Sequence, residues 1–430
     1  MYLSSSIATN IPIIASVGAI VSGIFILLLF RPAWAFSALF LSLMIGQTLR
    51  LPITGQGGGI LISDIVIPIV ALSLFFAVVV RNKPLTVSKS STFYGICIFP
   101  FLLYSFLLLA LHERALGIHS FAIAFLYWVR LFGVLLVFPM AAMFGSVKSG
   151  KEFIRKGFVS TYWMLITLGY MQIFIFPSLV GNINGWDPHI HRMISTWFDP
   201  NFFGAFIVIG MMPALYWSRF KIPLFVLSCG ALLLTASRSS WIACIAAMLV
   251  TGCFFFLTTS LSQAWKKAIH VFIVICILLV VTISGVFSDR VVKLFTHDPT
   301  VSIRTEAYKE VWRRMVEPNI VFGVGYNAYQ FSAKDAGLIQ DFSIHSRAGS
   351  DNSIITLLVT TGIIGTALFL IPILFGLYWH AASWILSSRK ESLLYIWSAI
   401  ALLVHSQFEN SLLYPHLLIP FLLISALVSI

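Results

Sequence analysis

Three short polar clusters interrupt an otherwise apolar chain. They are Arg192 to Asn201, Ser237-Arg238-Ser239-Ser240, and His345 to Ser353. Each contains arginine, and the first and third also carry carboxylate and amide side chains. Each stands directly before an apolar segment, so we expect each at the N-terminal end of a helix, with Asp199 as an N-cap and Pro200 at the first helical position. Helix N-termini favour anions and guanidinium groups bind phosphate through paired hydrogen bonds, so convergence of these clusters predicts a diphosphate site. The alternative is that each arginine extends its charge to the membrane surface.

Arg130 lies in the middle of an apolar segment, where a charge is costly unless it is paired. Asp64 and Glu409, near the ends of other segments, are available partners. We favour a structural ion pair, with a substrate contact as the alternative. The sequence contains no HExxH motif, no metal-type cysteine spacing and no nucleotide-binding motif, so it predicts no metal and no cofactor.

The composition determines which elements must position these residues. The chain has 430 residues, of which 59% are hydrophobic and 10% charged, with a mean hydropathy of +0.97. A soluble domain carries about 25% charged residues, so an ordinary soluble enzyme is excluded. We predict an all-α polytopic membrane protein with about 12–13 transmembrane helices. The apolar segments are 11–30, 33–48, 60–80, 93–111, 121–144, 158–176, 202–217, 222–236, 239–257, 268–287, 354–378, 393–404 and 412–430.

Alternate breaks between these segments are basic, and they hold 14 of the 27 Lys and Arg residues. The positive-inside rule places these breaks in the cytoplasm and the three polar clusters on the outer face. The net charge of +12 therefore reports topology and does not predict nucleic-acid binding. The whole chain, residues 1–430, is expected to form one membrane domain, with residues 288–353 as a long extracytoplasmic loop.

Within this loop, apolar residues spaced by four predict a helix over 302–316 that Pro318 ends, followed by a turn at Gly323-Val-Gly325. Opposite charges support the helix at Glu306 with Lys309 and Glu310 with Arg314. The alternative is an amphipathic helix on the membrane surface. Aromatic residues of the loop either line a sugar groove or lie at the membrane interface: Tyr308, Trp312, Tyr326, Tyr329 and Phe331.

At these same residues the sequence resembles the O-antigen ligase and O-antigen polymerase superfamily of bacterial envelope glycosyltransferases. Four stretches carry the resemblance: Arg192 to Asn201; Thr-Ala-Ser-Arg238-Ser-Ser-Trp241; Arg304 to Trp312 with the following Pro318 and Gly323-Val-Gly325; and Asp351 to Gly365. The similarity covers about the last 240 residues, whereas the first 180 match only in hydropathy.

The resemblance implies an enzyme of the bacterial inner membrane whose active site faces the periplasm. Such an enzyme takes a glycan from undecaprenyl diphosphate and transfers it to a sugar hydroxyl, without nucleotide or metal. The arginines that hold the donor diphosphate in such families map to Arg192 and Arg238. Weaker candidates for substrate contacts are Arg304, Arg347, Asn201 and Asn352.

Ligases of this superfamily carry a histidine eleven positions before a glycine, and counting back from Gly362 reaches Asp351. Asp351 would then accept the acceptor's proton, or His345 would reach the position from the loop. The alternative for Asp351 is a helix N-cap. The missing histidine favours a polysaccharide polymerase over a ligase.

Besides lipid-linked donor, sugar-hydroxyl acceptor and membrane lipids, a polymerase would work with a flippase and a chain-length regulator. A ligase would instead attach the finished glycan to a lipid A-core or other acceptor. A third reading is a polysaccharide flippase or other transporter. A transporter should carry ionisable groups along a central path, whereas here they gather at one face, with Arg130 as the exception.

Overall fold

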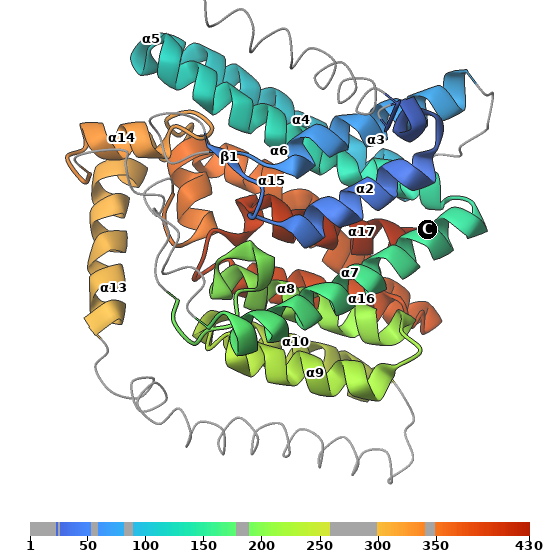
Figure 1. Cartoon of the computed structure of the whole chain (residues 1–430). Helices are drawn as coiled ribbons and strands as arrows, with labels where there is room; N and C mark the ends of the chain where they lie inside the picture. Colours follow the sequence, from blue (N-terminus) through green and yellow to red (C-terminus); the bar gives the residue numbers. More distant parts are fainter. Residues whose placement is uncertain are drawn as a thin grey trace, which may run out of the picture.

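The structure is a computed structural model. It describes residues 23–24, 26–52, 59–80, 89–177, 189–258, 299–339 and 349–430 (Figure 1).

Within these ranges, seven helices are long and apolar enough to cross a membrane. They are α3 (Ile62–Val79), α4 (Lys89–Leu111), α6 (Ile118–Gly145), α7 (Lys148–Ile175), α8 (Pro200–Trp217), α10 (Arg238–Thr258) and α15 (Ser353–Ser387). Four shorter apolar helices accompany them: α2 (Pro32–Ile45), α9 (Lys221–Leu234), α16 (Ser392–His405) and α17 (Pro415–Ser429). The predicted all-α polytopic membrane protein is thus confirmed.

Eleven of the thirteen predicted spans coincide with these helices. The span 268–287 lies outside the described residues, and the span 11–30 is described only from residue 23, apart from residue 25. One short antiparallel pairing joins β1 (Leu51–Pro52) to β2 (Gly59–Ile60). Helices dominate because a spanning segment in lipid must satisfy its backbone hydrogen bonds internally.

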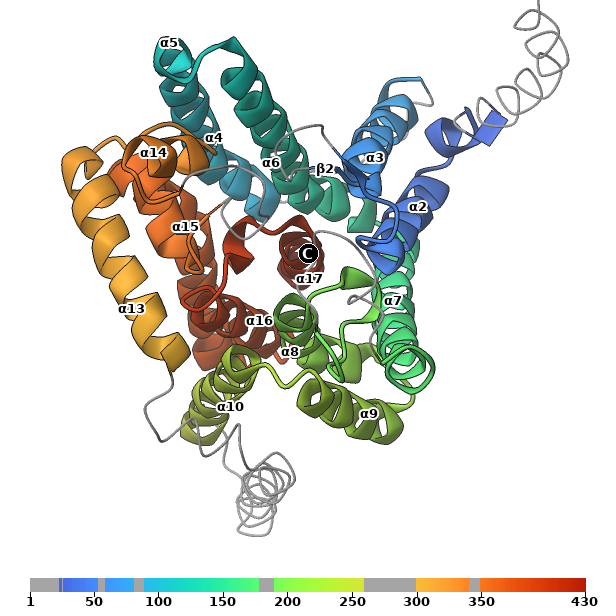
Figure 2. The same cartoon turned by 60° about the vertical axis from the view of Figure 1, so that its left-hand side comes forward.

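Helix α17 forms the centre of the bundle. Figure 2 shows α17 surrounded by other helices, and it packs against α6, α8 and α16. Every residue from Pro415 to Val428 is buried. A helix that is apolar on all sides fits such a central position, because it has no face to present to a polar phase.

The two ends of the bundle carry different sets of charged residues. At one end, Glu391 forms ion pairs with Arg155, Lys151 (3.8 Å) and Arg389 (3.9 Å). These residues come from two of the breaks that the charge pattern assigns to the cytoplasm. The 35-residue helix α15 connects this end to its own first turn at Ser353.

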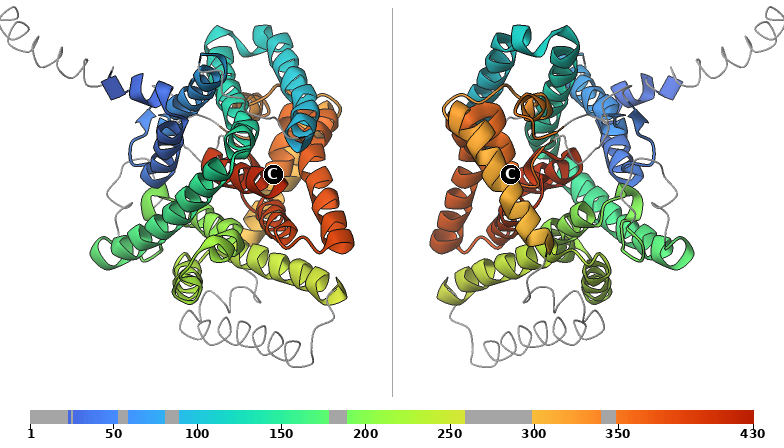
Figure 3. Two further views of the ribbon diagram at one scale, coloured as in Figure 1. Left: turned by 90° about the vertical axis from the view of Figure 1, so that its right-hand side faces the viewer. Right: turned by 90° about the vertical axis from the view of Figure 1, so that its left-hand side faces the viewer.

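The opposite end carries the short helices α13 (Pro299–Val311) and α14 (Tyr329–Asp335). Helix α13 continues as a π-helical turn, Trp312–Val316, and Pro318 lies in the 3-10 turn that follows. Figure 3, in its right-hand view, shows α13 running diagonally across the bundle. The predicted helix over 302–316 is confirmed, and so are its charge pairs, Glu306 with Lys309 (2.7 Å) and Glu310 with Arg314 (2.6 Å).

The segment after α13 is attached to a kink in α15. The kink is at Gly362, with φ 63° and ψ −171° inside the helix. Four backbone hydrogen bonds join the segment to α15: Ile363 N to Ile320 O (2.8 Å), Val324 N to Val359 O (2.9 Å), Gly325 N to Thr360 O (3.0 Å) and Ile364 N to Val321 O (3.5 Å). A Cβ at Gly362 would overlap the Val321 carbonyl, and φ is +75° at Gly323 and +106° at Gly325. The predicted turn at Gly323-Val-Gly325 is therefore confirmed, and its glycines fit it to the helix.

Candidate active site

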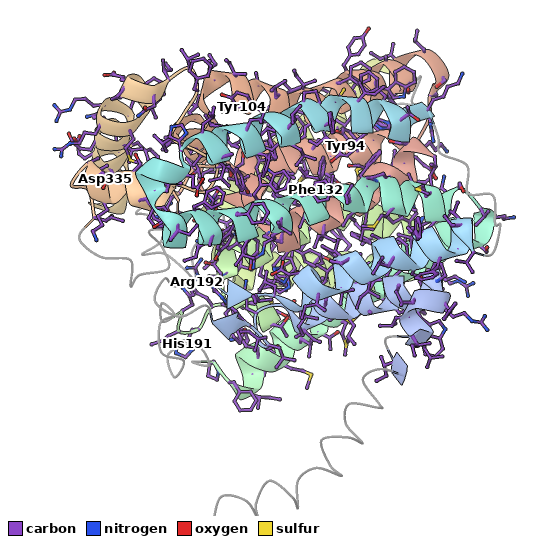
Figure 4. All side chains as sticks on the ribbon, turned by 90° about the horizontal axis from the view of Figure 1, so that it is seen from above. Tyr94, Tyr104, Phe132, His191, Arg192 and Asp335 are labelled. Atoms are coloured by element: carbon purple, nitrogen blue, oxygen red, sulfur yellow. The ribbon has the colours of Figure 1, made fainter. Side chains whose placement is uncertain are left out.

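A polar cavity of ≈ 790 Å³ lies at the end of the bundle that carries α13 and α14. Four of the predicted site residues line it, and they come from three separate parts of the chain: Arg192 and Asn201 from the first cluster, Arg304 from the loop helix and Asp351 from the third cluster. In Figure 4, Arg192 lies toward the same end of the bundle as Asp335 of α14. The structure thus brings together residues up to 159 positions apart, from 192 to 351.

The first cluster is organised by the start of α8. The Asp199 side chain accepts hydrogen bonds from the backbone N–H of Asn201 (2.7 Å) and Phe202 (3.1 Å), and Pro200 is the first helical residue. The predicted N-cap at Asp199 and the predicted place of Pro200 are both confirmed. The cap fixes Asn201 at the first turn of the helix, where its side chain lines the cavity.

Arg192 is held on the cavity wall by acceptors from two elements. Its Nε donates to the Thr235 carbonyl (2.8 Å), and its Nη2 donates to Asn201 Oδ1 (3.0 Å) and to the Ala236 carbonyl (3.4 Å). Ala236 has φ 48°, in the left-handed region, so the turn between α9 and α10 adopts an unusual shape to present this carbonyl. The guanidinium is consequently fixed in place before any ligand binds.

From Arg192 a chain of polar contacts crosses the cavity wall. Asn201 Nδ2 donates to Glu409 Oε1 (2.9 Å), and the same oxygen lies 3.6 Å from Nη2 of Arg304. Arg304 Nε is in turn 3.3 Å from Asp351 Oδ2. Burial alone would lower the pKa of Arg304, but Glu409 and Asp351 outweigh it and raise that pKa. Arg304 therefore stays a cation, held between two carboxylates.

Glu409 is the member of this chain that the sequence did not assign to the site. It lies in the break between α16 and α17, and its side chain is 10% exposed. Burial raises the pKa of its carboxyl well above the ordinary value, and the negative charges of Asp199 and Asp351 raise it further. The signal that could have identified Glu409 is its position, because it is a carboxylate in a break that the charge pattern predicts to face outward.

Asp351 and Asn352 have different tasks. Asn352 is the N-cap of α15, since its Oδ1 accepts from the backbone N–H of Ile354 (2.8 Å) and Ile355 (3.1 Å). The N-cap alternative for Asp351 is therefore wrong, and its carboxylate faces Arg304 instead. Asn352 Nδ2 donates to the Gln407 carbonyl (3.0 Å), and Asn352 is not among the described residues that line the cavity.

The described residues of the second cluster do not line the cavity but lie behind its wall. Arg238 is the half-buried first residue of α10, and within the described ranges it does not line the cavity. Hydrogen bonds link its neighbours to one another and to α16: Ser240 Oγ to Ser237 Oγ (2.9 Å) and Ser239 Oγ to His405 Nε2 (3.1 Å). Arg238 thus directly follows the turn whose carbonyls bind Arg192. His345 and Arg347 lie outside the described residues.

The wall formed by α6 and the β1–β2 pair carries two more arginines, Arg50 and Arg130. Arg130 binds both oxygens of Asp64, with Nε to Oδ1 at 2.9 Å and Nη2 to Oδ2 at 2.6 Å. The predicted ion pair of Arg130 is confirmed with Asp64, whereas Glu409 lies with Arg304. Burial lowers the pKa of Arg50, and the nearby Arg130 charge acts in the same direction.

Aromatic residues of the loop reach the cavity in part. Tyr326 and Tyr329 line it, while the Tyr308 hydroxyl donates to the Asp351 carbonyl oxygen (2.9 Å). Trp312 is 41% exposed, and Phe331 is buried. Of these aromatic residues, Tyr326 and Tyr329 therefore belong to the cavity wall, and Trp312 is exposed.

A second cavity of ≈ 300 Å³ lies between α4, α6, α15 and α17 and is mainly apolar. Phe138, Phe369 and Phe421 are among its lining residues, and Leu418 lines both this cavity and the polar one. An apolar space therefore adjoins the charged site.

Residues 223–370 match the family described as O-antigen ligase, Wzy_C. The chain carries a Wzy_C O-antigen ligase family domain. The matched range includes Arg238, Arg304 and Asp351, whereas Arg192 and Glu409 lie outside it. Over this range the membrane protein is similar to the O-antigen ligase family, and this similarity implies glycan transfer of the ligase or polymerase type from lipid-linked substrates. A comparison with curated proteins found no match.

Proposed function

We propose that this Wzy_C protein is a lipid-linked glycan polymerase of the bacterial inner membrane. It extends a surface polysaccharide, such as an O-antigen, a capsule or an exopolysaccharide, on the periplasmic face. The observation that carries the proposal is the convergence of Arg192, Asn201, Arg304 and Asp351 on one cavity at one end of the bundle. The basic breaks, including those joined through Glu391, would lie at the cytoplasmic end.

The donor is undecaprenyl diphosphate carrying a glycan, and its diphosphate binds the guanidinium groups of Arg192 and Arg304. Because the leaving group gains negative charge as the glycosidic bond breaks, cations already fixed in place stabilise the transition state. Arg192 meets this condition through its bonds to Thr235 and Asn201. Arg238 is a further proposed cation for the donor, supported by its place next to the turn that Arg192 binds.

The lipid part of the donor would occupy the apolar cavity that shares Leu418 with the polar one. Burying a hydrocarbon chain in such a space is favourable, whereas the diphosphate needs the charged wall. Among the described residues the two cavities share one lining residue, Leu418, so the polar and the apolar space are neighbours, as a ligand with a charged head and an apolar tail requires.

The acceptor is a sugar hydroxyl of a second glycan, placed by the polar and aromatic wall that includes Tyr326 and Tyr329. A carboxylate of the cavity removes the hydroxyl proton, and the oxygen attacks the anomeric carbon from the side opposite the diphosphate. The transfer inverts this carbon and requires neither nucleotide nor metal. His345 is the other proposed base, from the third polar cluster.

Polymerase and ligase differ only in the acceptor. Asp351 stands where ligases carry a histidine, which favours the polymerase, while the description of the matched family favours the ligase. Deleting the gene and analysing the surface polysaccharide separates them. Single repeat units in the deletion strain support a polymerase. Long undecaprenyl-linked chains that are not attached to an acceptor would instead identify a ligase.

Arg238→Ala, expressed in the deletion strain, tests the proposed role of Arg238 by whether the surface polysaccharide is restored. If Arg238 binds the donor, this variant makes no polymer although the protein is present in the membrane at the wild-type level. Wild-type polymer from Arg238→Ala would leave donor binding to the arginines that line the cavity.

A further inference from the structure

The polar cavity is lined by three carboxylates, and their surroundings differ. Asp199 uses Oδ1 to cap α8 through two backbone N–H groups. Asp351 is 43% exposed and holds Arg304 through Oδ2. The Glu409 side chain is 10% exposed, so it is much more enclosed than that of Asp351. The three carboxylates therefore differ in their partners, and Asp351 and Glu409 differ in exposure.

The backbone of Glu409 is fixed to the elements that build the site. Its N–H donates to the His405 carbonyl (3.2 Å) at the end of α16. Its own carbonyl accepts from Ser353 Oγ (3.0 Å) and from the Ser411 N–H (2.8 Å). Ser353 is the first residue of α15, so Glu409 is held beside the start of the helix that follows Asp351.

The two contacts of the Glu409 carboxylate are both made by Oε1. Asn201 Nδ2 donates to this oxygen at 2.9 Å, and Arg304 Nη2 lies 3.6 Å from it. Among the described residues, no hydrogen bond or ion pair reaches Oε2. One oxygen is therefore used to fix the carboxylate, and the other is available to take a proton.

Asn201 also connects Glu409 to the proposed donor site. Its Oδ1 accepts from Arg192 while its Nδ2 donates to Glu409. The Asn201 amide thus lies between the Glu409 carboxylate and the Arg192 guanidinium, which is proposed to bind the diphosphate. Because the acceptor hydroxyl attacks from the side of the anomeric carbon opposite the diphosphate, its base must lie close to the diphosphate site without binding the diphosphate itself. The Asn201 amide separates Glu409 from Arg192 in this way.

We propose that Glu409 is the general base that accepts the proton of the acceptor hydroxyl, with Asp351 as a positioning residue that holds Arg304. This inference rests on the proposed glycan transfer. The acceptor oxygen forms a bond to the anomeric carbon, and the bond from that carbon to the diphosphate oxygen breaks. Its electron pair leaves with undecaprenyl diphosphate, and the hydroxyl proton moves to Oε2 of Glu409. No oxidation or reduction occurs.

The charges around Glu409 agree with this role. Burial, Asp199 and Asp351 raise the pKa of its carboxyl, while Arg304 and Arg192 act in the opposite direction. Among the described residues, Tyr308 also interacts with Glu409. A raised pKa makes a carboxylate a stronger base. Because only the deprotonated form accepts a proton, the rate should rise as the pH rises through the pKa of Glu409.

The test measures kcat, the pH profile and donor binding for purified Glu409→Gln, with undecaprenyl diphosphate-linked repeat units as substrate. We expect kcat to fall at least about 100-fold, as is typical for loss of a general base. Binding of the donor should be retained, and the acidic limb of the pH profile should disappear. Glu409→Asp should restore part of the rate with the limb at a shifted pH.

Two matched variants separate catalysis from support. Glu317→Gln, the same change at an exposed glutamate of the turn after α13, should leave kcat unchanged. Asp351→Asn should lower the rate but keep the acidic limb. Wild-type activity measured alongside reports on the proposed function itself. An active Glu409→Gln with an intact acidic limb, or one that loses donor binding together with turnover, would overturn the assignment while glycan transfer by the wild type stands.

Discussion

Among single residues, Arg192 is the cation on which the proposed donor binding depends most. Its guanidinium is bonded to Thr235 and Asn201 before a ligand arrives, so it needs little rearrangement to receive a diphosphate. We predict that Arg192→Ala lowers glycan transfer at least about 100-fold, as removal of a fixed charge-stabilising donor does elsewhere. The measurement is turnover by purified protein at saturating donor.

Arg192→Lys keeps the charge but loses the paired geometry, so we expect an activity between those of the wild type and the alanine variant. Arg219→Ala is the matched control, because Arg219 is exposed in a predicted cytoplasmic break. Full activity of Arg192→Ala in protein that folds normally would contradict the role of Arg192.

Residue type and spacing together with the family resemblance predicted Arg192, Asn201, Arg304 and Asp351, which the cavity brings together. They could not decide which of the adjacent residues Asp351 and Asn352 caps α15, because both types favour that position and only the backbone geometry distinguishes them. Glu409 was missed as a site residue because its partners, Asn201 and Arg304, are distant in sequence.

At the scale of elements, the N-cap of α15 controls how the helix presents Asp351. Asn352 supplies an acceptor to two otherwise unpaired backbone N–H groups. We predict that Asn352→Ala lowers the free energy of unfolding by about 1 kcal/mol, and that Asn352→Ser recovers most of it. Thermal unfolding in detergent measures both. Equal stability of the alanine variant and the wild type would show that the cap does not contribute.

The kink of α15 gives a second prediction for this element. Gly362 has a positive φ and no room for a Cβ, because the Val321 carbonyl lies against it. We expect Gly362→Ala to destabilise the fold by roughly 2 kcal/mol or more, since strained backbone and displaced neighbours add. The readout is the amount of folded protein in the membrane.

Gly252→Ala is the control for this variant, because a Cβ at Gly252 meets nothing within 4 Å. This helical position in α10 should tolerate alanine or gain up to about 1 kcal/mol. If Gly362→Ala accumulates as well as Gly252→Ala, the packing of the loop segment on the kink is not important for stability.

Hydropathy predicted most of the helices, because spans in lipid must be long and apolar, and the 302–316 helix followed from its period of four. The kink at Gly362 was not predicted, since a glycine inside an apolar run gives no local sign of a bend. Its cause is tertiary: the segment from Ile320 to Gly325 hydrogen-bonds to α15 across the kink.

At the scale of the whole molecule, the proposal places the cavity on the periplasmic side. In a variant without the five native cysteines, single cysteines at Lys334 in α14 and Lys390 after α15 report on the two ends. We predict that a membrane-impermeant maleimide labels Lys334→Cys in spheroplasts and labels Lys390→Cys only after lysis. The reverse pattern would place the cavity in the cytoplasm and contradict the proposed topology.

The order of the helices around α17 was not predictable from hydropathy, because every apolar segment satisfies the same length rule. Which segment lies at the centre depends on packing with its neighbours, here α6, α8 and α16. The convergence of Arg192 and Asp351 depends on that order, so the candidate residues could be named from the sequence while their shared cavity could not.

The most direct test is glycan transfer by the purified protein in liposomes with undecaprenyl diphosphate-linked repeat units. We predict new glycosidic bonds and release of one undecaprenyl diphosphate for each bond formed, without added nucleotide. If the wild type only moves the lipid-linked glycan between leaflets and forms no new bond, the protein is a transporter and the central claim is contradicted.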